Sequence, residues 1–198
     1  MAKIIKFPIP TPEKFGPQRV RKRKEIRQDP SGQLNLFTGG KVVKLSQLTV
    51  FEEALLLDEQ GNKQRAKIGY LQAIEQGDSL ADAYCNLGII ECLEGAQAKA
   101  IDSFTQSLKE DPRHFEAHYN LANLYGEIGN FPLAKAHYEI SIQLEPSFPN
   151  SYFNLGLTFA MNKEFEKAIK AIKQFRKLAQ PEDQKLADDL IQKLSTAQ

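Results

Sequence analysis

The chain has 198 residues, of which 41% are hydrophobic and 26% charged, and its formal net charge is +1. This length suits one domain with a tail, and no stretch is long and apolar enough to span a bilayer. Two cysteines and the absence of a secretory signal pattern argue against a disulfide-stabilised secreted protein, so we expect a cytoplasmic location.

The small net charge hides a difference between the two ends of the chain. Residues 1–45 carry eleven Lys or Arg against three acidic residues, whereas the remainder carries fifteen against twenty-two. Five of the ten prolines lie in the first thirty residues, and no apolar periodicity is found there. This composition predicts that residues 1–45 form a flexible, disordered basic arm.

The densest basic stretch of the arm, RVRKRK, has three interpretations. Its basic side chains are Arg19, Arg21, Lys22, Arg23 and Lys24. They can be solvated charges on a tail, or they can contact the phosphates of DNA or RNA in a salt-sensitive, sequence-independent way. The third possibility is that the arm folds back on the acidic remainder of the chain and occupies its own groove.

A short apolar segment, QLNLF at residues 33–37, follows in the same arm. It resembles the pentapeptide by which many bacterial proteins dock onto the DNA polymerase sliding clamp. The resemblance implies that Gln33 is the polar anchor and that Leu36 and Phe37 fill an apolar pocket. Alternatively, Leu34, Leu36 and Phe37 pack on the following helices or occupy their groove.

A period of 34 residues governs the rest of the chain. Alanines recur at Ala66, Ala100, Ala134 and Ala168, and asparagines keep the same spacing at Asn86, Asn120 and Asn154. Each copy contains two apolar-periodic stretches of about a dozen residues, which predict two helices. Gly95 and Gly129 separate these stretches in two copies, as expected at a helix C-terminus. One helical hairpin is therefore copied and stacked.

The pattern resembles the tetratricopeptide repeat. The large residues Tyr84, His118 and Tyr152 precede a Leu followed by Gly or Ala, and Phe104 and Tyr138 fill the later aromatic position. The resemblance implies an all-α, right-handed helical-hairpin solenoid. We expect a degenerate repeat at residues 46–80, full repeats at 81–114, 115–148 and 149–182, and a polar-faced capping helix at 183–198.

The resemblance also implies a concave surface lined by the first helix of each repeat. The candidate groove residues are Cys85, Asn86, Ile89, Tyr119, Asn120, Asn123, Phe153, Asn154 and Leu157. Because Asn carries both a donor and an acceptor, three equally spaced asparagines can pair with the main chain of an extended peptide. The alternative is that these asparagines serve packing between helices.

The groove lacks the basic side chains by which chaperone-binding members of the family hold a C-terminal carboxylate. The matching positions hold Phe51, Asp82, Cys85, Glu116 and Asn120. We therefore expect the partner peptide to be apolar, neutral or basic rather than an acidic tail.

Catalytic, cofactor and metal-binding patterns are not found. His114 and His118 have metal-like spacing without a third ligand, and Cys85 and Cys92 are interpreted as small apolar fillers. We predict a non-enzymatic adaptor that binds a partner peptide in its groove. The alternative is a DNA- or RNA-associated accessory factor whose arm contacts phosphate or the sliding clamp.

Overall fold

The structure is a computed structural model of the chain, and it describes residues 16–20, 34–35, 40–41 and 48–196. Within these residues nine α-helices follow one another. Their bounds are α2 (Val50–Glu59), α3 (Lys63–Gln76), α4 (Leu80–Leu93), α5 (Gln97–Glu110), α6 (Phe115–Glu127), α7 (Phe131–Leu144), α8 (Pro149–Met161), α9 (Phe165–Leu178) and α10 (Pro181–Ser195). Two short strands, β1 (Leu34–Asn35) and β2 (Gly40–Lys41), pair antiparallel.

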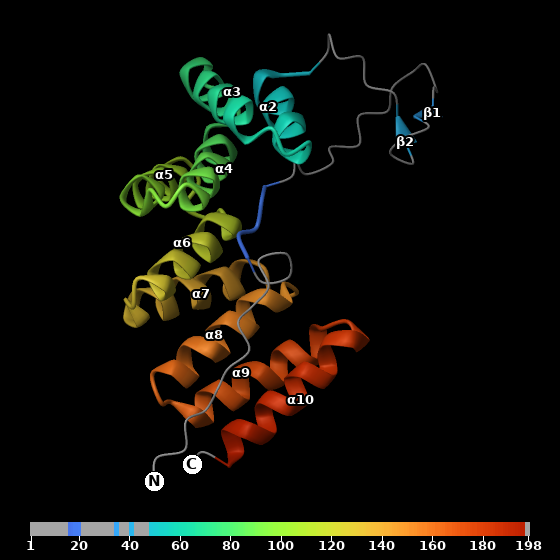
Figure 1. Cartoon of the computed structure of the whole chain (residues 1–198), viewed down its shortest axis with the longest axis vertical. Coiled ribbons are helices and arrows are strands. Elements are labelled where there is room, and N and C mark those ends of the chain that lie inside the picture. Colours follow the sequence, from blue (N-terminus) through green and yellow to red (C-terminus); the bar gives the residue numbers. More distant parts are fainter. Residues whose placement is uncertain (1–15, 21–33, 36–39, 42–47, 197–198) are drawn as a thin grey trace.

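The helices form hairpins that stack in chain order. Helix α2 packs on α3, α4 on α5, α6 on α7 and α8 on α9, and each hairpin packs against the next (Figure 1). Helix α10 covers α9 at the C-terminal end of the stack. The predicted all-α solenoid of helical hairpins is thus confirmed. No helix in the described ranges combines the length and the apolar character needed to cross a membrane.

Small residues in the first helix of each hairpin allow the second helix to approach. A Cβ atom placed on Gly88 would lie 2.8 Å from the ring of Phe104, which is fully buried. Such a distance is below ordinary van der Waals contact, so a larger residue here would force the two helices apart. Ala122 and Gly156 stand at the same repeat position.

A left-handed residue joins the two helices of each hairpin. The φ angles are +80° at Gly61, +75° at Gly95 and +80° at Gly129. The fourth hairpin has Lys163 at this position, with a φ of +61°. Because a side chain strains this backbone conformation, the last hairpin turn is less stable than the other three.

Replacing Lys163 with Gly should therefore stabilise the protein by about 1 kcal/mol. The side chain is exposed, so little packing is lost with it. Urea denaturation of the two chains measures the difference. The matched change Gly129→Ala should destabilise by a similar amount. A Lys163→Gly variant no more stable than the wild type would contradict the strain at this turn.

Two histidines meet between α6 and α7. Nδ1 of His118 lies 2.9 Å from Nδ1 of His137, and Nε2 of His118 lies 3.2 Å from the carbonyl of Pro112. Since a carbonyl only accepts, His118 Nε2 carries a proton and its Nδ1 accepts from His137. Burial lowers the pKa of His118, and burial together with the neighbouring His118 lowers the pKa of His137 to about 4.

This pair predicts a loss of stability on acidification. Both rings are neutral in the folded chain at pH 7, whereas in the unfolded chain they take up protons near the ordinary pKa of 6.5. The contribution is present above pH 6.5 and is lost as the pH falls toward 4. Between pH 7 and 5 the free energy of unfolding should fall by on the order of 1 kcal/mol more in the wild type than in His137→Gln. Equal losses in urea titrations of the two chains would contradict this.

Candidate functional site

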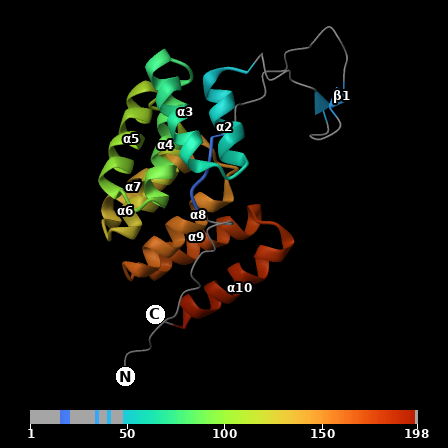
Figure 2. The same ribbon diagram turned by 45° about the horizontal axis from the view of Figure 1, so that its top comes forward.

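The N-terminal residues 16–20 lie along the inner side of the helix stack. This stretch, the arm segment, runs beside α4 and α6 in both views (Figures 1 and 2). Side chains 66 and 102 residues further along the chain hold it by hydrogen bonds. We define the groove as the surface of α4, α6 and the end of α2 that contacts the arm segment.

Two asparagines in adjacent repeats bracket the main chain of the arm segment. Asn120 Oδ1 accepts from the amide of Gln18 at 2.7 Å, and its Nδ2 donates to the carbonyl of Gln18 at 2.8 Å. Asn86 makes the same pair of contacts with Val20, at 3.0 and 3.3 Å. Each carboxamide thus satisfies both main-chain polar groups of one residue, whatever side chain that residue carries.

A tyrosine extends this pattern by one step. The hydroxyl of Tyr119 donates to the carbonyl of Gly16 at 3.3 Å. Gly16, Gln18 and Val20 alternate along the arm segment, and alternate residues of an extended chain present their N–H and C=O groups to the same edge. Pro17, which has no N–H, lies at an intervening position and is exposed.

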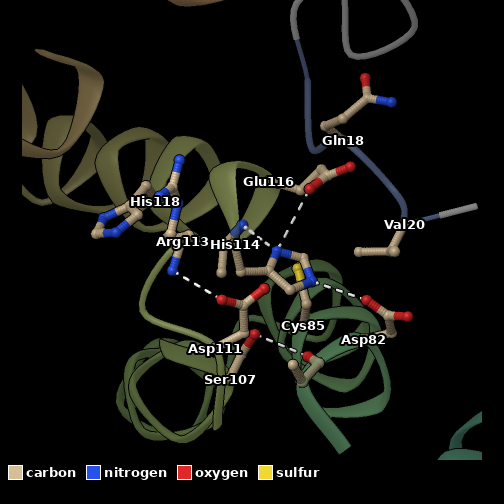
Figure 3. Close-up of polar contacts among 12 residues, drawn as sticks. Gln18, Val20, Asp82, Cys85, Ser107, Asp111, Arg113, His114, Glu116 and His118 are labelled. Carbon is tan, nitrogen blue, oxygen red and sulfur yellow. Dashed lines mark hydrogen bonds and ion pairs between the residues drawn. The ribbon is translucent and has the colours of Figure 1, made fainter. Parts of the chain in front are cut away.

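The side chain of Val20 enters the apolar part of the groove. It is 5% exposed and belongs to one buried cluster with Cys85, Ile89 and Leu121. Figure 3 shows it over α4, on the side that carries Cys85. Burying a valine contributes roughly 1.5–3 kcal/mol, so this contact is a main source of arm binding.

The buried carboxylate of Asp58 contacts Arg19, the arm residue before Val20. Nε of Arg19 lies 3.1 Å from Oδ2 of Asp58, whose side chain is fully buried. The hydroxyl of Tyr70 donates to the same oxygen at 3.4 Å. Burial, and secondly the Asp58 carboxylate, raise the pKa of Tyr70 well above its ordinary value, which keeps this donor protonated.

Asp58 did not figure among the residues predicted from the sequence. A signal was present, because Asp58 stands 34 residues before Cys92 and so shares a groove-facing repeat position. The degenerate first repeat obscured it. The aspartate lies in the last turn of α2, which is where that helix reaches the groove.

The third repeated asparagine supports Tyr119. Nδ2 of Asn154 donates to the Tyr119 oxygen at 3.0 Å and to Oδ1 of Asn123 at 2.9 Å. Asn123 also accepts from the hydroxyl of Tyr138 at 2.6 Å. Asn154 and Asn123 therefore orient the tyrosine that contacts Gly16, and their own contact with a ligand stays a prediction.

Two further candidates pack in the C-terminal part of the stack. Phe153 is fully buried, with its ring centroid 4.9 Å from that of Phe175. Leu157 is partly buried against the same apolar cluster. Ligand contact by Phe153 and Leu157 also remains a prediction.

Acidic side chains flank the arm segment on α4 and α6. Nε2 of His114 lies 3.0 Å from Asp82, and its Nδ1 lies 3.4 Å from Glu116 (Figure 3). Nδ1 also accepts from the amide of Ala117, so His114 caps α6. With Asp58, these carboxylates give the groove an acidic lining beside a basic arm.

Most of the candidate nucleic-acid and clamp contacts lie outside the described residues. This applies to Arg21, Lys22, Arg23, Lys24, Gln33, Leu36 and Phe37. The middle of the QLNLF segment, Leu34–Asn35, forms β1 and pairs with Gly40–Lys41. Arg19 is engaged by Asp58.

The thiols of the groove are protonated rather than reactive. Burial raises the pKa of Cys85 well above its ordinary value and that of Cys92 to about 12. Within the described ranges, no group of three or more His, Cys, Asp or Glu side chains could hold a metal ion.

Stacked helical hairpins with a chain segment held on their inner face define a helical-repeat protein. Residues 119–182 match the family model described as tetratricopeptide repeat. The structure resembles MamA (residues 41 to end) from Desulfovibrio magneticus RS-1, with a TM-score of 0.60 and 20% identity over 75% of this chain and 92% of that chain. Residues 119–182 thus match the tetratricopeptide repeat family, and the stacked hairpins have the fold of a tetratricopeptide repeat protein.

Two further proteins are similar to this chain, one in structure and one in sequence. The structure named "TPR2B-domain:pHsp70-complex of yeast Sti1" matches with a TM-score of 0.55 and 20% identity over 60% of this chain and 98% of that chain. Human protein O-mannosyl-transferase TMTC3 is 32% identical over an alignment 123 residues long, which covers 57% of this chain. This chain spans only 13% of the length of TMTC3.

Removing one carboxamide should release the arm residue that it brackets. In Asn120→Ala, the amide of Gln18 should exchange with solvent about tenfold faster, because it loses a partly buried hydrogen bond. The amide of Val20 should change less, since Asn86 still holds it. NMR exchange measurements on the full chain would show this. Asn162→Ala, an exposed asparagine at the end of α8, is the control. An unchanged exchange rate of the Gln18 amide in Asn120→Ala would show that the Asn120 side chain does not hold this residue.

Proposed function

We propose that the protein is a non-enzymatic adaptor whose groove binds an extended peptide segment of another protein. The observation that carries this proposal is the double bracket of Gln18 by Asn120 and of Val20 by Asn86. The groove accepts an extended chain through main-chain contacts, which any peptide of suitable side chains can supply.

The contact is energetically suited to capture from solution. Four hydrogen bonds satisfy the main-chain groups of Gln18 and Val20, so that burying them leaves no unpaired amide or carbonyl there. The buried valine then adds apolar surface that water would otherwise cover. Specificity comes from the side chains of the bound peptide. The asparagines fix its position along the groove, because each one holds the main chain of one peptide residue and the two residues are two positions apart.

The charge of the groove favours some peptides over others. Asp58, Asp82 and Glu116 face or flank the arm segment, so an acidic ligand would meet like charges. The named structural relative from yeast is a complex with pHsp70, which supports a protein partner engaged through a peptide. For this chain we propose a neutral, apolar or basic peptide.

The proposal predicts that the two asparagines are required together. The double variant Asn86→Ala/Asn120→Ala should lose partner capture by tenfold or more, because four main-chain contacts disappear. Affinity capture followed by quantitative mass spectrometry measures the recovered partner. Circular dichroism and thermal melting establish that the variant is folded.

Asn162→Ala serves as the matched control, since it also replaces an asparagine by Ala but lies outside the groove. A folded double variant that recovers the same proteins in the same amounts as the control would rule out the groove as the binding site.

A further inference from the structure

Asp58 occupies an unfavourable place for a carboxylate. It lies in the last turn of α2, where the helix dipole is negative, and that turn contains no basic residue. The residue is only 1% exposed. A buried carboxylate at a helix C-terminus is destabilising unless a cation and hydrogen-bond donors accompany it. Asp58 therefore needs a positive partner from outside its own helix.

The arm supplies that cation, but only in part. Arg19 reaches Oδ2 of Asp58 through Nε. The other oxygen, Oδ1, is buried and has no hydrogen-bond partner among the residues that the structure describes. A guanidinium group can donate to both oxygens of a carboxylate at once, whereas an ammonium group acts as a point charge. The site is thus built for a more complete arginine contact than Arg19 makes.

A second side-chain site adjoins the first. The residue after Arg19 is Val20, which fills the apolar cluster of Cys85 and Ile89 while Asn86 brackets its main chain. Neighbouring residues of an extended chain point to opposite sides. The groove therefore contacts the side chains of two consecutive residues. Asp58 contacts the first, Arg19, and the apolar cluster contacts the second, Val20.

We infer that the groove selects partner segments in which an arginine is followed by a β-branched or similar aliphatic residue, and that the arm segment is an intramolecular competitor for the same sites. This inference rests on the proposed function. Charge complementarity with Asp58 and the fit of Val20 identify the partner's chemistry. The arm segment runs from Tyr119 through Asn120 to Asn86, toward the first repeat, and the inferred partner segment takes the same direction.

The arm competes effectively with a partner segment because it is covalently attached to the protein that carries the groove. An arm joined covalently to its groove is present at an effective concentration that a separate peptide must exceed. A partner segment whose arginine donates to both carboxylate oxygens of Asp58 gains a hydrogen bond to Oδ1 that the arm lacks. Such a segment can displace the arm although it is not tethered.

The test uses fluorescent peptides and the full-length chain carrying Val20→Asp, which expels the arm by placing a charge in the apolar cluster. The probe is EKFGPQRVRKR, the sequence of residues 13–23. Fluorescence anisotropy should show the probe binding Val20→Asp about tenfold more tightly than the wild type. Probe variants replace its Arg at position 19 by Ala or Lys, or its Val at position 20 by Asp.

The Ala and Asp variants should each bind about tenfold more weakly, and the Lys variant should lie between them and the parent probe. Repeating the titration with Asp58→Asn in the same chain should reduce the Arg-to-Ala difference to less than about twofold. The peptide variants alone test the inference should Asp58→Asn fail to fold.

The outcomes separate the two proposals. Probe binding that requires Asn86 and Asn120 but ignores both side-chain changes would overturn this inference and leave the proposed function standing. No binding of any probe to Val20→Asp would overturn the inference, while the capture experiment would still decide the proposed function. Wild-type dimers in sedimentation analysis that dissociate on Val20→Asp would identify a second copy as the occupant, and would also overturn it.

Discussion

A buried main chain must have its amide and carbonyl groups satisfied, and this requirement organises the groove. In the described helices, main-chain amides and carbonyls pair with each other within the helix. The arm segment has no regular secondary structure and depends on side chains from α4 and α6 instead. Asn86 and Asn120 can perform this role because the carboxamide has the same donor and acceptor groups as the peptide bond. The 34-residue repeat then places two of them on successive helices.

The stacking itself depends on short interhelical distances within each hairpin. Gly88 leaves room for the ring of Phe104, and left-handed residues such as Gly95 join the two helices. These features set the position of α4 relative to α5, and α5 in turn packs on α6, which carries the second asparagine. The geometry of the groove is therefore a consequence of packing far from the peptide. The arm segment fits this geometry, with Gln18 on Asn120 and Val20 on Asn86.

Much of the fold could be predicted from the sequence because repetition amplifies weak signals. A single alanine or glycine says little, whereas Ala66 and its three periodic equivalents specify a hairpin stack. The tetratricopeptide fold was predicted for this reason and is confirmed. The periodicity also singled out Asn86 and Asn120. It could not show that Asn154 would hydrogen-bond to Tyr119, because that contact depends on tertiary packing between repeats.

Asp58 and the arm segment were harder to predict for different physical reasons. Asp58 lies in a repeat whose pattern is degenerate, so its groove-facing position was not evident. The arm segment has no apolar periodicity, and its position depends on long-range hydrogen bonds to Asn86 and Asn120. The charge difference between the two ends of the chain was consistent with an arm that folds back into the groove of the acidic repeats, but it did not identify the arm residues that Asn86 and Asn120 would contact.

The most direct measurement concerns the placement of Val20 in the groove. In a full-length monomeric chain with selectively labelled methyl groups, nuclear Overhauser effects should connect Val20 with Ile89, since both belong to one buried cluster. A sample that mixes differently labelled chains distinguishes contacts within one molecule from contacts between two. Intramolecular Val20–Ile89 contacts are the expected result. Their absence, with Val20 showing the chemical shifts of a solvent-exposed valine, would contradict the account of the groove as a receptor for an extended chain.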